Sequence, residues 1–351
     1  MGYFDDIDFA ASKDGSICLY DKKAGDIFHS ETGALKEAYD KFISPLKPLF
    51  SNFPENLNIL DICYGIGYNT KAAFETLKNF NLKIDALEYN KELVYLSPFI
   101  NDKIDNDDLK MFLLSEIYNS GIDYDVFKGV FKHISGQNFK QFISAFTMPF
   151  IEGLNTRMIE NTHGQISDAF LHNIYYLYIS SSMKNCLKTP EYKDSCINFF
   201  FGDARKSILK TNNKYDIIFL DAFSPKKTPE LWTIDFLAVL KSKMKQNSVL
   251  ISYSKSSPFR SALLELGFYA GKTFAENIEA GTIASDNPDF ILNKLSKDDI
   301  DILNTRSGIP YRDKNLSSSA AEILLNRKLE ADASYRLSRT QYEKMRASSF
   351  Q

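Results

Sequence analysis

The hydrophobic positions of this chain form short continuous runs separated by stretches with helical spacing, which is the pattern of an α/β protein. Asn58–Ile62 and Lys83–Glu88 are two such runs, and a helical pattern from Lys71 to Leu77 lies between them. Further runs follow at Ile197–Phe201, Ile217–Leu220 and Ser248–Tyr253. We therefore expect a Rossmann-like α/β fold, with a mostly parallel sheet and helices on both faces.

The same patterns divide the chain into four parts. Residues 1–52 predict a small N-terminal extension with a hairpin and a helix, while residues 53–99 and 197–289 form the expected core. Residues 100–196 carry long helical patterns and few strand patterns, which indicates a helical insertion. Residues 290–351 predict a charged helical C-terminal extension.

Three elements of the carboxyl-terminal half are predicted in more detail. A helix from Ser257 to Leu266 ends at Gly267, because glycine suits the left-handed conformation at a helix end. A hairpin is expected from Phe268 to Ile283, and one charged helix from Ala320 to about Arg346.

The first strand pattern leads into a glycine turn. Gly65 and Gly67 follow the strand, and a helical pattern begins behind them. Glycines let the backbone turn tightly and approach a ligand, and a helix start offers free N–H groups. A dinucleotide fingerprint requires a third glycine where this chain has Thr70, so the turn favours a smaller adenosine-bearing ligand over NAD or FAD.

Two later strands end on acids. Glu88 closes the second strand, about twenty residues after the turn, where a carboxylate can accept hydrogen bonds from both ribose hydroxyls. Asp203 follows the third strand and suits an adenine amino group. Together with the glycine turn, these acids predict a site for S-adenosylmethionine.

A third acid, Asp221, ends the strand pattern that begins at Tyr215, and a Pro-punctuated loop with two aromatics follows it. Ligands of open α/β sheets bind beyond the carboxyl ends of the strands. Asp221 is thus expected at the lip of a pocket, with Phe223 and Trp232 as candidate walls. The alternative is that Asp221 only caps the next helix.

Several motifs, in this order, resemble the MnmC/MnmD family, the methyltransferases that make 5-methylaminomethyl-2-thiouridine at the tRNA wobble position. They are Gly65-Ile66-Gly67-Tyr68-Asn69, Gly202-Asp203-Ala204, Asp221-Ala222-Phe223-Ser224-Pro225 and Pro229-Glu230-Leu231-Trp232. Segments around His29, Glu31, Glu37, Gly281 and Gly308 also fit the family pattern, whereas the stretch from about Phe99 to Cys196 is longer than the family's usual connection.

The resemblance implies a tRNA methyltransferase that uses S-adenosylmethionine to convert a 5-aminomethyl wobble (2-thio)uridine to its 5-methylaminomethyl form. It implies these cofactor residues: Gly65, Gly67 and Asn69 at the methionine part, Glu88 at the ribose, and Asp203 with Ala204 at the adenine. Methyl transfer to an amine requires a neutral, well-oriented nucleophile. Asp221 is the expected catalytic carboxylate, Phe223 and Trp232 are expected to stack on the flipped base, and Tyr253 is a weaker candidate for the same pocket.

The expected partner is the anticodon region of tRNA, together with a separate enzyme that supplies the aminomethyl uridine. The net charge of −3 is unlike that of a general nucleic-acid binder. Between Lys226 and Lys272, however, eight basic residues face only three acids, and Lys226 and Lys227 lie in the pocket loop itself. They are candidate phosphate contacts, although a solvated helix face explains such lysines equally well.

Composition narrows the remaining choices. No window resembles a membrane span and the start has no leader pattern, so a cytoplasmic protein without membrane contact is expected. The four cysteines lack Cys-x-x-Cys spacing and the four histidines are scattered, so no metal is expected.

Other functions stay open. An aminopropyltransferase, or another S-adenosylmethionine-dependent methyltransferase of small amines, would share the sheet and the acidic pocket. A nicotinamide oxidoreductase is disfavoured by Thr70, and a non-catalytic RNA-binding relative by the presence of Gly65, Gly67 and Asp221.

Overall fold

The computed structural model describes residues 7–21, 26–27, 33–100, 102–127, 129, 192 and 194–348. The chain divides into two compact units, which are described separately. The first contains Met1–Tyr39 and Tyr64–Phe201, and the second contains Asp40–Cys63 and Gly202–Gln351.

The first unit begins with a small antiparallel sheet of three strands in the order β1-β2-β3. The strands are β1 (Ile7–Ala11), β2 (Ile17–Asp21) and β3 (Asp26–Ile27). The turn between β1 and β2 caps the helix α1 (Ala34–Ala38), because Asp14 Oδ2 accepts the Lys36 amide at 3.0 Å and Ser16 Oγ accepts the Ala34 amide at 3.1 Å. The hairpin and helix expected in this region are both present.

The first unit also contains a parallel strand pair, β5 (Asn81–Glu88) and β6 (Cys196–Phe201). In this pair Glu88 lies opposite Phe201, so both strands end at the same edge. The helical segments of this unit are α2 (Tyr68–Thr76), α3 (Lys91–Leu96), η4 (Ser97–Phe99) and α4 (Asp107–Asn119). The helix α4 lies within the predicted insertion, but most of residues 128–193 lie outside the described residues, so the insertion stays a prediction.

The second unit contains five strands in the order β4-β7-β8-β10-β9. They are β4 (Asn56–Ile62), β7 (Tyr215–Leu220), β8 (Met244–Ser252), β9 (Tyr269–Ala275) and β10 (Ile278–Ser285). The pairs β4–β7 and β7–β8 are parallel, while β10 runs antiparallel to both β8 and β9. Every residue of β7 is buried, as expected for a central parallel strand.

The predicted hairpin is the β9–β10 pair, and its turn explains its shape. Glu276 and Asn277 join the strands with φ of 49° and 67°. Positive φ at both central residues is characteristic of a type I′ turn, whose twist matches that of the strands.

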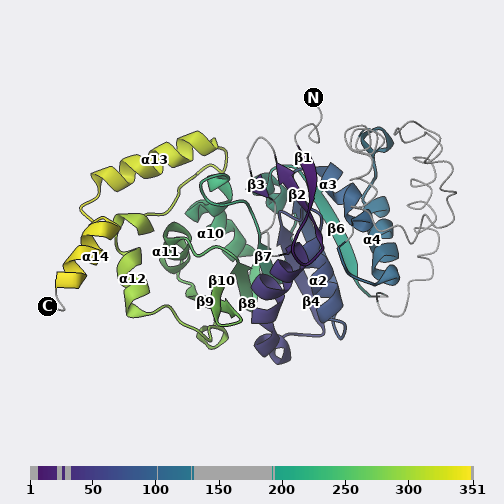
Figure 1. Cartoon of the computed structure of the whole chain (residues 1–351), viewed down its shortest axis with the longest axis horizontal. Helices are drawn as coiled ribbons and strands as arrows, with labels where there is room; N and C mark the ends of the chain where they lie inside the picture. Colours follow the sequence, from purple (N-terminus) through teal and green to yellow (C-terminus); the bar gives the residue numbers. More distant parts are fainter. Residues whose placement is uncertain are drawn as a thin grey trace. The chain divides into compact units, whose positions relative to one another are not determined.

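The helical segments of the second unit lie before, between and after its strands in the sequence. They are η2 (Tyr39–Ile43, which begins in the first unit), η3 (Ser44–Asn52), α9 (Ala204–Ser207), η7 (Ile208–Lys210), η8 (Pro229–Trp232), α10 (Ile234–Lys243), α11 (Ser257–Glu265), η9 (Pro288–Phe290), α12 (Lys297–Leu303), η10 (Arg306–Gly308), α13 (Ala320–Ala333) and α14 (Arg339–Ser348). The pairs α10–α11 and α11–α12 pack together, as Figure 1 shows.

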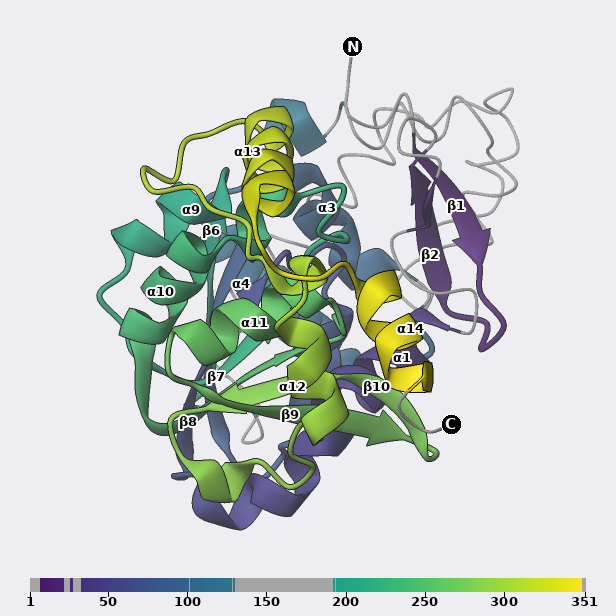
Figure 2. The same ribbon diagram turned by 90° about the vertical axis from the view of Figure 1, so that its left-hand side faces the viewer.

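Two helix ends test the predictions directly. The α11 helix ends as expected, because Gly267 has φ of 76° and the Phe268 amide donates to the Leu263 carbonyl at 3.0 Å. The single helix expected from Ala320 to Arg346 is wrong, since α13 and α14 are separate helices (Figure 2). The backbone is extended at Ser334, and Ser338 starts the second helix by accepting the Gln341 amide through its side chain.

Candidate active site and cofactor residues

The glycine turn begins directly after β4 in the sequence and ends at the start of α2. Gly65 has φ of 58° and Gly67 has φ of 84°, and the Gly67 amide donates to the Tyr64 carbonyl at 2.8 Å. A Cβ at Gly67 would lie 2.3 Å from the Tyr64 hydroxyl oxygen. Glycine is therefore required at this position by both backbone conformation and space.

Glu88 is attached to this turn by hydrogen bonds. Its Oε2 accepts the Gly65 amide at 2.7 Å and its Oε1 accepts the Asn90 amide at 2.9 Å. Burial raises the pKa of the carboxyl above its usual 4.5, while these backbone hydrogen bonds oppose the rise. An ionised carboxylate offers about four acceptor positions, so both oxygens keep capacity for further donors. The structure thus brings two predicted cofactor residues, Gly65 and Glu88, into direct contact.

A buried polar network lies beneath the turn. Ser97 Oγ donates to the Ile66 carbonyl at 2.8 Å and lies 2.9 Å from the Tyr64 hydroxyl. Lys71 Nζ donates to the Ser97 carbonyl at 2.7 Å and pairs with Asp102 at 2.8 Å, with both side chains almost fully buried. Burial lowers the pKa of Lys71 and the Asp102 carboxylate opposes that shift. The network restrains the glycine turn through the Ile66 carbonyl and the Tyr64 hydroxyl.

Asn69 and Ala204 lie at the starts of two helices. Asn69 is in the first turn of α2 and is buried, with 6 % of its surface exposed. Ala204 is the first residue of α9, and Asp203 is the N-cap of that helix, accepting the Arg205 amide at 2.9 Å. Gly202 before it has φ of 111°, and no described atom outside residues 201–203 lies within 4 Å of the place a Cβ would occupy.

Asp221 follows β7 at the carboxyl edge of the β4–β7 pair. Leu220 lies opposite Ile62, and the Asp221 amide donates to the Ile62 carbonyl at 3.3 Å. The Asp221 side chain is partly exposed. The next helical segment, η8, has Thr228 as its N-cap, and α10 has Thr233. The structure therefore does not support the alternative in which Asp221 caps the next helix.

Aromatic and hydroxyl donors fix the loop after Asp221. The Ala222 carbonyl accepts the Tyr253 hydroxyl at 2.8 Å, and the Phe223 carbonyl accepts both Trp232 Nε1 and Thr228 Oγ1 at 2.8 Å. Because these donors come from η8, its N-cap and the end of β8, two successive loop carbonyls are held from different elements. The loop is thereby pre-organised.

Trp232 is placed differently from the other loop aromatic. Its side chain is fully buried, and its ring packs edge-to-face with Phe259 at 5.1 Å and Tyr253 at 6.1 Å between centroids. Phe223 is partly exposed. The geometry supports Trp232 as a donor that holds the loop, and Phe223 as the residue of the two that keeps accessible ring surface.

At least six of the eight basic residues between Lys226 and Lys272 have structural partners. Lys241 and Lys243 donate to the Leu266 and Thr211 carbonyls, and Lys245 pairs with Asp216 at 2.6 Å. Lys255 donates to the Glu279 carbonyl at 3.2 Å, Arg260 pairs with Glu279 at 2.7 Å, and Lys272 pairs with Asp299 at 2.8 Å. Lys226 and Lys227 are exposed on the turn that the Ser224 carbonyl closes by accepting the Lys227 amide at 2.8 Å, so solvent-borne partners can reach both side chains.

Tyr89 was missed by the sequence analysis. It follows Glu88 directly, and 74 % of its surface is exposed, which is unusual for a large aromatic at the end of a buried strand. An aromatic directly behind a strand-end acid is the signal that would have drawn attention to it.

Known proteins that are similar to this chain identify its family. A family model described as S-adenosyl-L-methionine-dependent methyltransferase matches residues 168–277. An uncharacterised protein of Methanocaldococcus jannaschii, MJ0670, is 31 % identical over 318 residues, which cover 90 % of this chain and 70 % of that protein. The chain belongs to the MnmC/MnmD-like S-adenosylmethionine-dependent methyltransferases.

Two further relatives give this family its name. The tRNA 5-methylaminomethyl-2-thiouridine biosynthesis bifunctional protein MnmC of Azoarcus sp. is 31 % identical over 77 residues, which are 22 % of this chain but only 12 % of that longer protein. The crystal structure of MNMC2 from Aquifex aeolicus matches with a TM-score of 0.60 and 23 % identity, covering 93 % of this chain and 85 % of that one. The predicted Rossmann-like class I methyltransferase fold is confirmed.

The residues present fit S-adenosylmethionine. In the first unit, the glycine turn provides backbone amides without side-chain bulk, and Glu88 keeps acceptor capacity for hydroxyl donors. In the described part of the chain, no group of three or more His, Cys, Asp or Glu side chains could hold a metal ion. No described helix of this methyltransferase is long and apolar enough to cross a membrane.

The first prediction concerns Glu88. Replacing it with Ala is expected to weaken S-adenosylmethionine binding by about 1–3 kcal/mol, the range for removing one partner of a buried hydrogen bond. Because its pKa is raised, acidification should weaken cofactor binding at a pH above 4.5, where the protonated carboxyl can no longer accept both hydroxyls.

Calorimetric titration across pH measures both effects. Glu88→Gln is the matched control, since it keeps the shape of the side chain but cannot titrate. Its affinity should be low and independent of pH over this range. A wild-type affinity that stays constant down to pH 4.5 would show that Glu88 does not contact the cofactor.

The second prediction concerns the loop. Trp232→Phe keeps an aromatic ring but removes the donor to the Phe223 carbonyl, so the free energy of unfolding should fall by about 1 kcal/mol. Turnover should fall as well, while cofactor affinity stays unchanged. Thr228→Val removes the other donor to that carbonyl, and the two changes should not be additive in a double-mutant cycle. Additive effects would mean that the loop is not held as a unit.

Proposed function

We propose that this methyltransferase transfers a methyl group to the 5-aminomethyl nitrogen of the wobble (2-thio)uridine in tRNA, forming the 5-methylaminomethyl nucleoside. The observation that carries the proposal is the position of Asp221, which ends a buried central strand and opens a loop held by Tyr253, Trp232 and Thr228. The similarity to proteins named for 5-methylaminomethyl-2-thiouridine biosynthesis supports the choice of substrate.

Asp221 is assigned the catalytic role. A free alkyl amine is mostly protonated near pH 7, and only its neutral form has a lone pair for attack. A carboxylate that hydrogen-bonds the ammonium group can orient it and accept its proton. S-adenosylmethionine, when bound, supplies an electrophilic methyl group on a sulfonium. The fixed loop limits the amine to few orientations, and such positioning accounts for a large part of the rate of a displacement.

The proposed cofactor residues follow from their positions in each unit. Gly65, Gly67 and Asn69 would hold the methionine part at the start of α2, and Glu88 would accept the ribose hydroxyls. Asp203 and the Ala204 amide would meet the adenine ring. Tyr89, exposed directly behind Glu88, would cover the nucleoside with its ring.

The tRNA contacts are assigned to the loop. A wobble base must leave the anticodon stack to reach a pocket, and an aromatic face can then support it. Phe223 is the candidate for this contact, and the buried Trp232 would act through the loop backbone. The exposed Lys226 and Lys227 would meet the phosphate backbone, which favours a polyanionic substrate over a small free amine. A separate enzyme would supply the aminomethyl group.

A direct assay tests the proposal. The protein is incubated with S-adenosylmethionine and tRNA that carries aminomethyl uridine, and the wobble nucleosides are analysed by mass spectrometry. The proposal expects one added methyl group at that nucleoside only. Transfer to polyamines or other small amines, with no change in the tRNA, would instead favour the small-amine alternative.

The third prediction concerns Asp221. Asp221→Asn keeps the shape but removes the proton acceptor, so turnover should fall by about 10²–10⁴-fold with little change in cofactor affinity. The residual rate should rise with pH, because more of the substrate amine is then neutral in solution. Single-turnover rates across pH give this profile, and a thermal melt controls for folding. Normal turnover in a folded variant would remove Asp221 from the mechanism.

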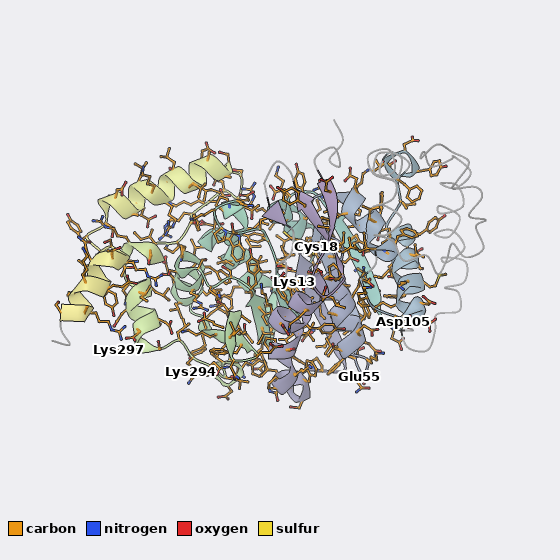
Figure 3. The ribbon with its side chains drawn as sticks, viewed as in Figure 1. Lys13, Cys18, Glu55, Asp105, Lys294 and Lys297 are labelled. Carbon is orange, nitrogen blue, oxygen red and sulfur yellow. The ribbon has the colours of Figure 1, made fainter. Side chains whose placement is uncertain are left out.

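The fourth prediction concerns the loop lysines. Methylation of tRNA should weaken as salt rises, and the double charge reversal Lys226→Glu with Lys227→Glu should raise the apparent KM for tRNA. The matched control is Lys294→Glu with Lys297→Glu, an exposed pair labelled in Figure 3 that produces the same change in net charge. Equal effects of the two pairs would mean that overall charge, not the loop, determines tRNA affinity.

A further inference from the structure

Arg205 connects the proposed adenine acid to a segment more than one hundred residues away. Its Nη2 donates to Asp203 Oδ2 at 2.7 Å and its Nε donates to Asp203 Oδ1 at 3.1 Å. Its Nη1 donates to Asp313 Oδ2 at 2.7 Å and to the Ser318 carbonyl at 2.9 Å. The guanidinium thus holds both oxygens of Asp203 while the C-terminal extension holds the guanidinium.

The segment from Asp313 to Ser318 is folded around this guanidinium. The Asp313 side chain is fully buried, and its Oδ1 accepts the amides of Ser317 and Ser318 at 3.1 and 3.0 Å. Burial raises the pKa of this carboxyl, but hydrogen bonds from the Ser318 amide and the Arg205 guanidinium lower the pKa by more. The pKa of Asp313 is therefore below its usual value. These donors keep the carboxylate ionised and fix its orientation, so that it accepts a charge-assisted hydrogen bond from Arg205.

The rest of the extension anchors that segment. The Asp313 amide donates to Asp235 Oδ2 at 2.6 Å, and the Ile234 amide donates to the Tyr311 carbonyl at 2.9 Å. Arg327 of α13 donates to the Ile309 carbonyl at 2.7 Å and lies 4.8 Å from the centre of the Tyr311 ring. The extension is therefore joined to the start of α10 by specific hydrogen bonds.

Two hydrogen bonds from a planar guanidinium fix the rotation of the carboxylate that they grip. A free Asp at a strand end has several side-chain conformations, and a ligand must select one of them at an entropic cost. With Arg205 in place, Asp203 has one conformation before the ligand arrives. Its Oδ1 already accepts the Arg205 amide and Nε, so Oδ2 is the oxygen that would accept a donor from the ligand.

We propose that Arg205 is a positioning residue for the cofactor's adenine, and that residues 313–318 of the C-terminal extension belong to the cofactor-binding apparatus through it. The proposal rests on the assignment of Asp203 to the adenine amino group. It gives the extension a function in this methyltransferase that does not require any contact with RNA.

Calorimetric binding of two ligands tests the proposal without any catalysis. The first ligand is S-adenosylhomocysteine, and the second is its analogue with hydrogen in place of the adenine amino group. The wild-type protein should prefer the first. In Arg205→Gln and in Asp313→Asn, affinity for the first should fall about tenfold or more, while affinity for the analogue changes little, so the preference is lost.

Arg327→Gln is the matched control, because it loosens the extension without touching Arg205 or Asp203. It should lower the melting temperature and leave the preference intact. Arg205→Lys, which keeps the charge but not the fork of donors, should restore only part of the preference.

Three outcomes would overturn the proposal. Unchanged binding of both ligands by Arg205→Gln and Asp313→Asn would show that the network does not act on the cofactor. An equal loss for both ligands, or a loss of preference in Arg327→Gln, would show only general loosening of the fold. A wild-type protein without any preference would reject the adenine contact itself, whereas methyl transfer to tRNA is measured separately and would be unaffected.

Discussion

Parallel strand pairing in register is the constraint on which the candidate site depends. In a parallel pair both strands end at the same edge. Residues that follow the two strands therefore become neighbours, and no additional contact is needed to bring them together. In the second unit Ile62 and Leu220 are opposite each other, and the Asp221 amide continues the pattern by donating to the Ile62 carbonyl. In the first unit Glu88 and Phe201 are opposite each other in the same way. The candidate site residues need only end or follow their strands, as Glu88 and Asp221 do.

This constraint also explains why the strand ends that carry the candidate site residues were predictable. Continuous hydrophobic runs identify buried parallel strands, and an acid or glycine at the carboxyl end of such a run marks the sheet edge where ligands bind. The positions of Glu88, Asp203 and Asp221 therefore follow from local patterns alone, and so does the β9–β10 hairpin. The Gly267 helix end is equally local, because it depends on backbone conformation and not on distant partners.

Features that depend on distant partners were not predictable. Trp232 reads as a pocket wall in the sequence, but its indole N–H has a partner in the Phe223 carbonyl and its ring is buried against Phe259. The lysines near position 243 read as a charged surface, yet Lys245 pairs with Asp216 across two strands. The break between α13 and α14 occurs where two serines replace intrahelical hydrogen bonds with capping ones, and propensity averaged over the whole charged stretch conceals it.

The buried charges show how the two units solve one problem in different ways. An ionised group away from water is tolerated only when several donors or acceptors replace its hydration. Under the glycine turn, Lys71 has the Asp102 carboxylate and the Ser97 carbonyl. Beside α9, Asp313 has Arg205 and two backbone amides. Removing one member would leave its partner buried and unpaired, at a cost of about 3–5 kcal/mol, so a single substitution in either network should lower the free energy of unfolding.

That cost has a consequence for specificity. A carboxylate held by a buried network cannot turn away from a ligand that lacks the matching donor, and it stays desolvated beside such a ligand. Discrimination then arises from the penalty on the wrong ligand as much as from contacts with the right one. Glu88, fastened by the Gly65 and Asn90 amides, and Asp203, fastened by Arg205, are both of this kind. After Asp221 the restraint acts on the loop itself, because the Ala222 carbonyl accepts the Tyr253 hydroxyl and the Phe223 carbonyl accepts donors from Trp232 and Thr228. A loop with fixed carbonyls limits the orientations in which a substrate can approach the proposed catalytic carboxylate, and proton transfer depends on that orientation.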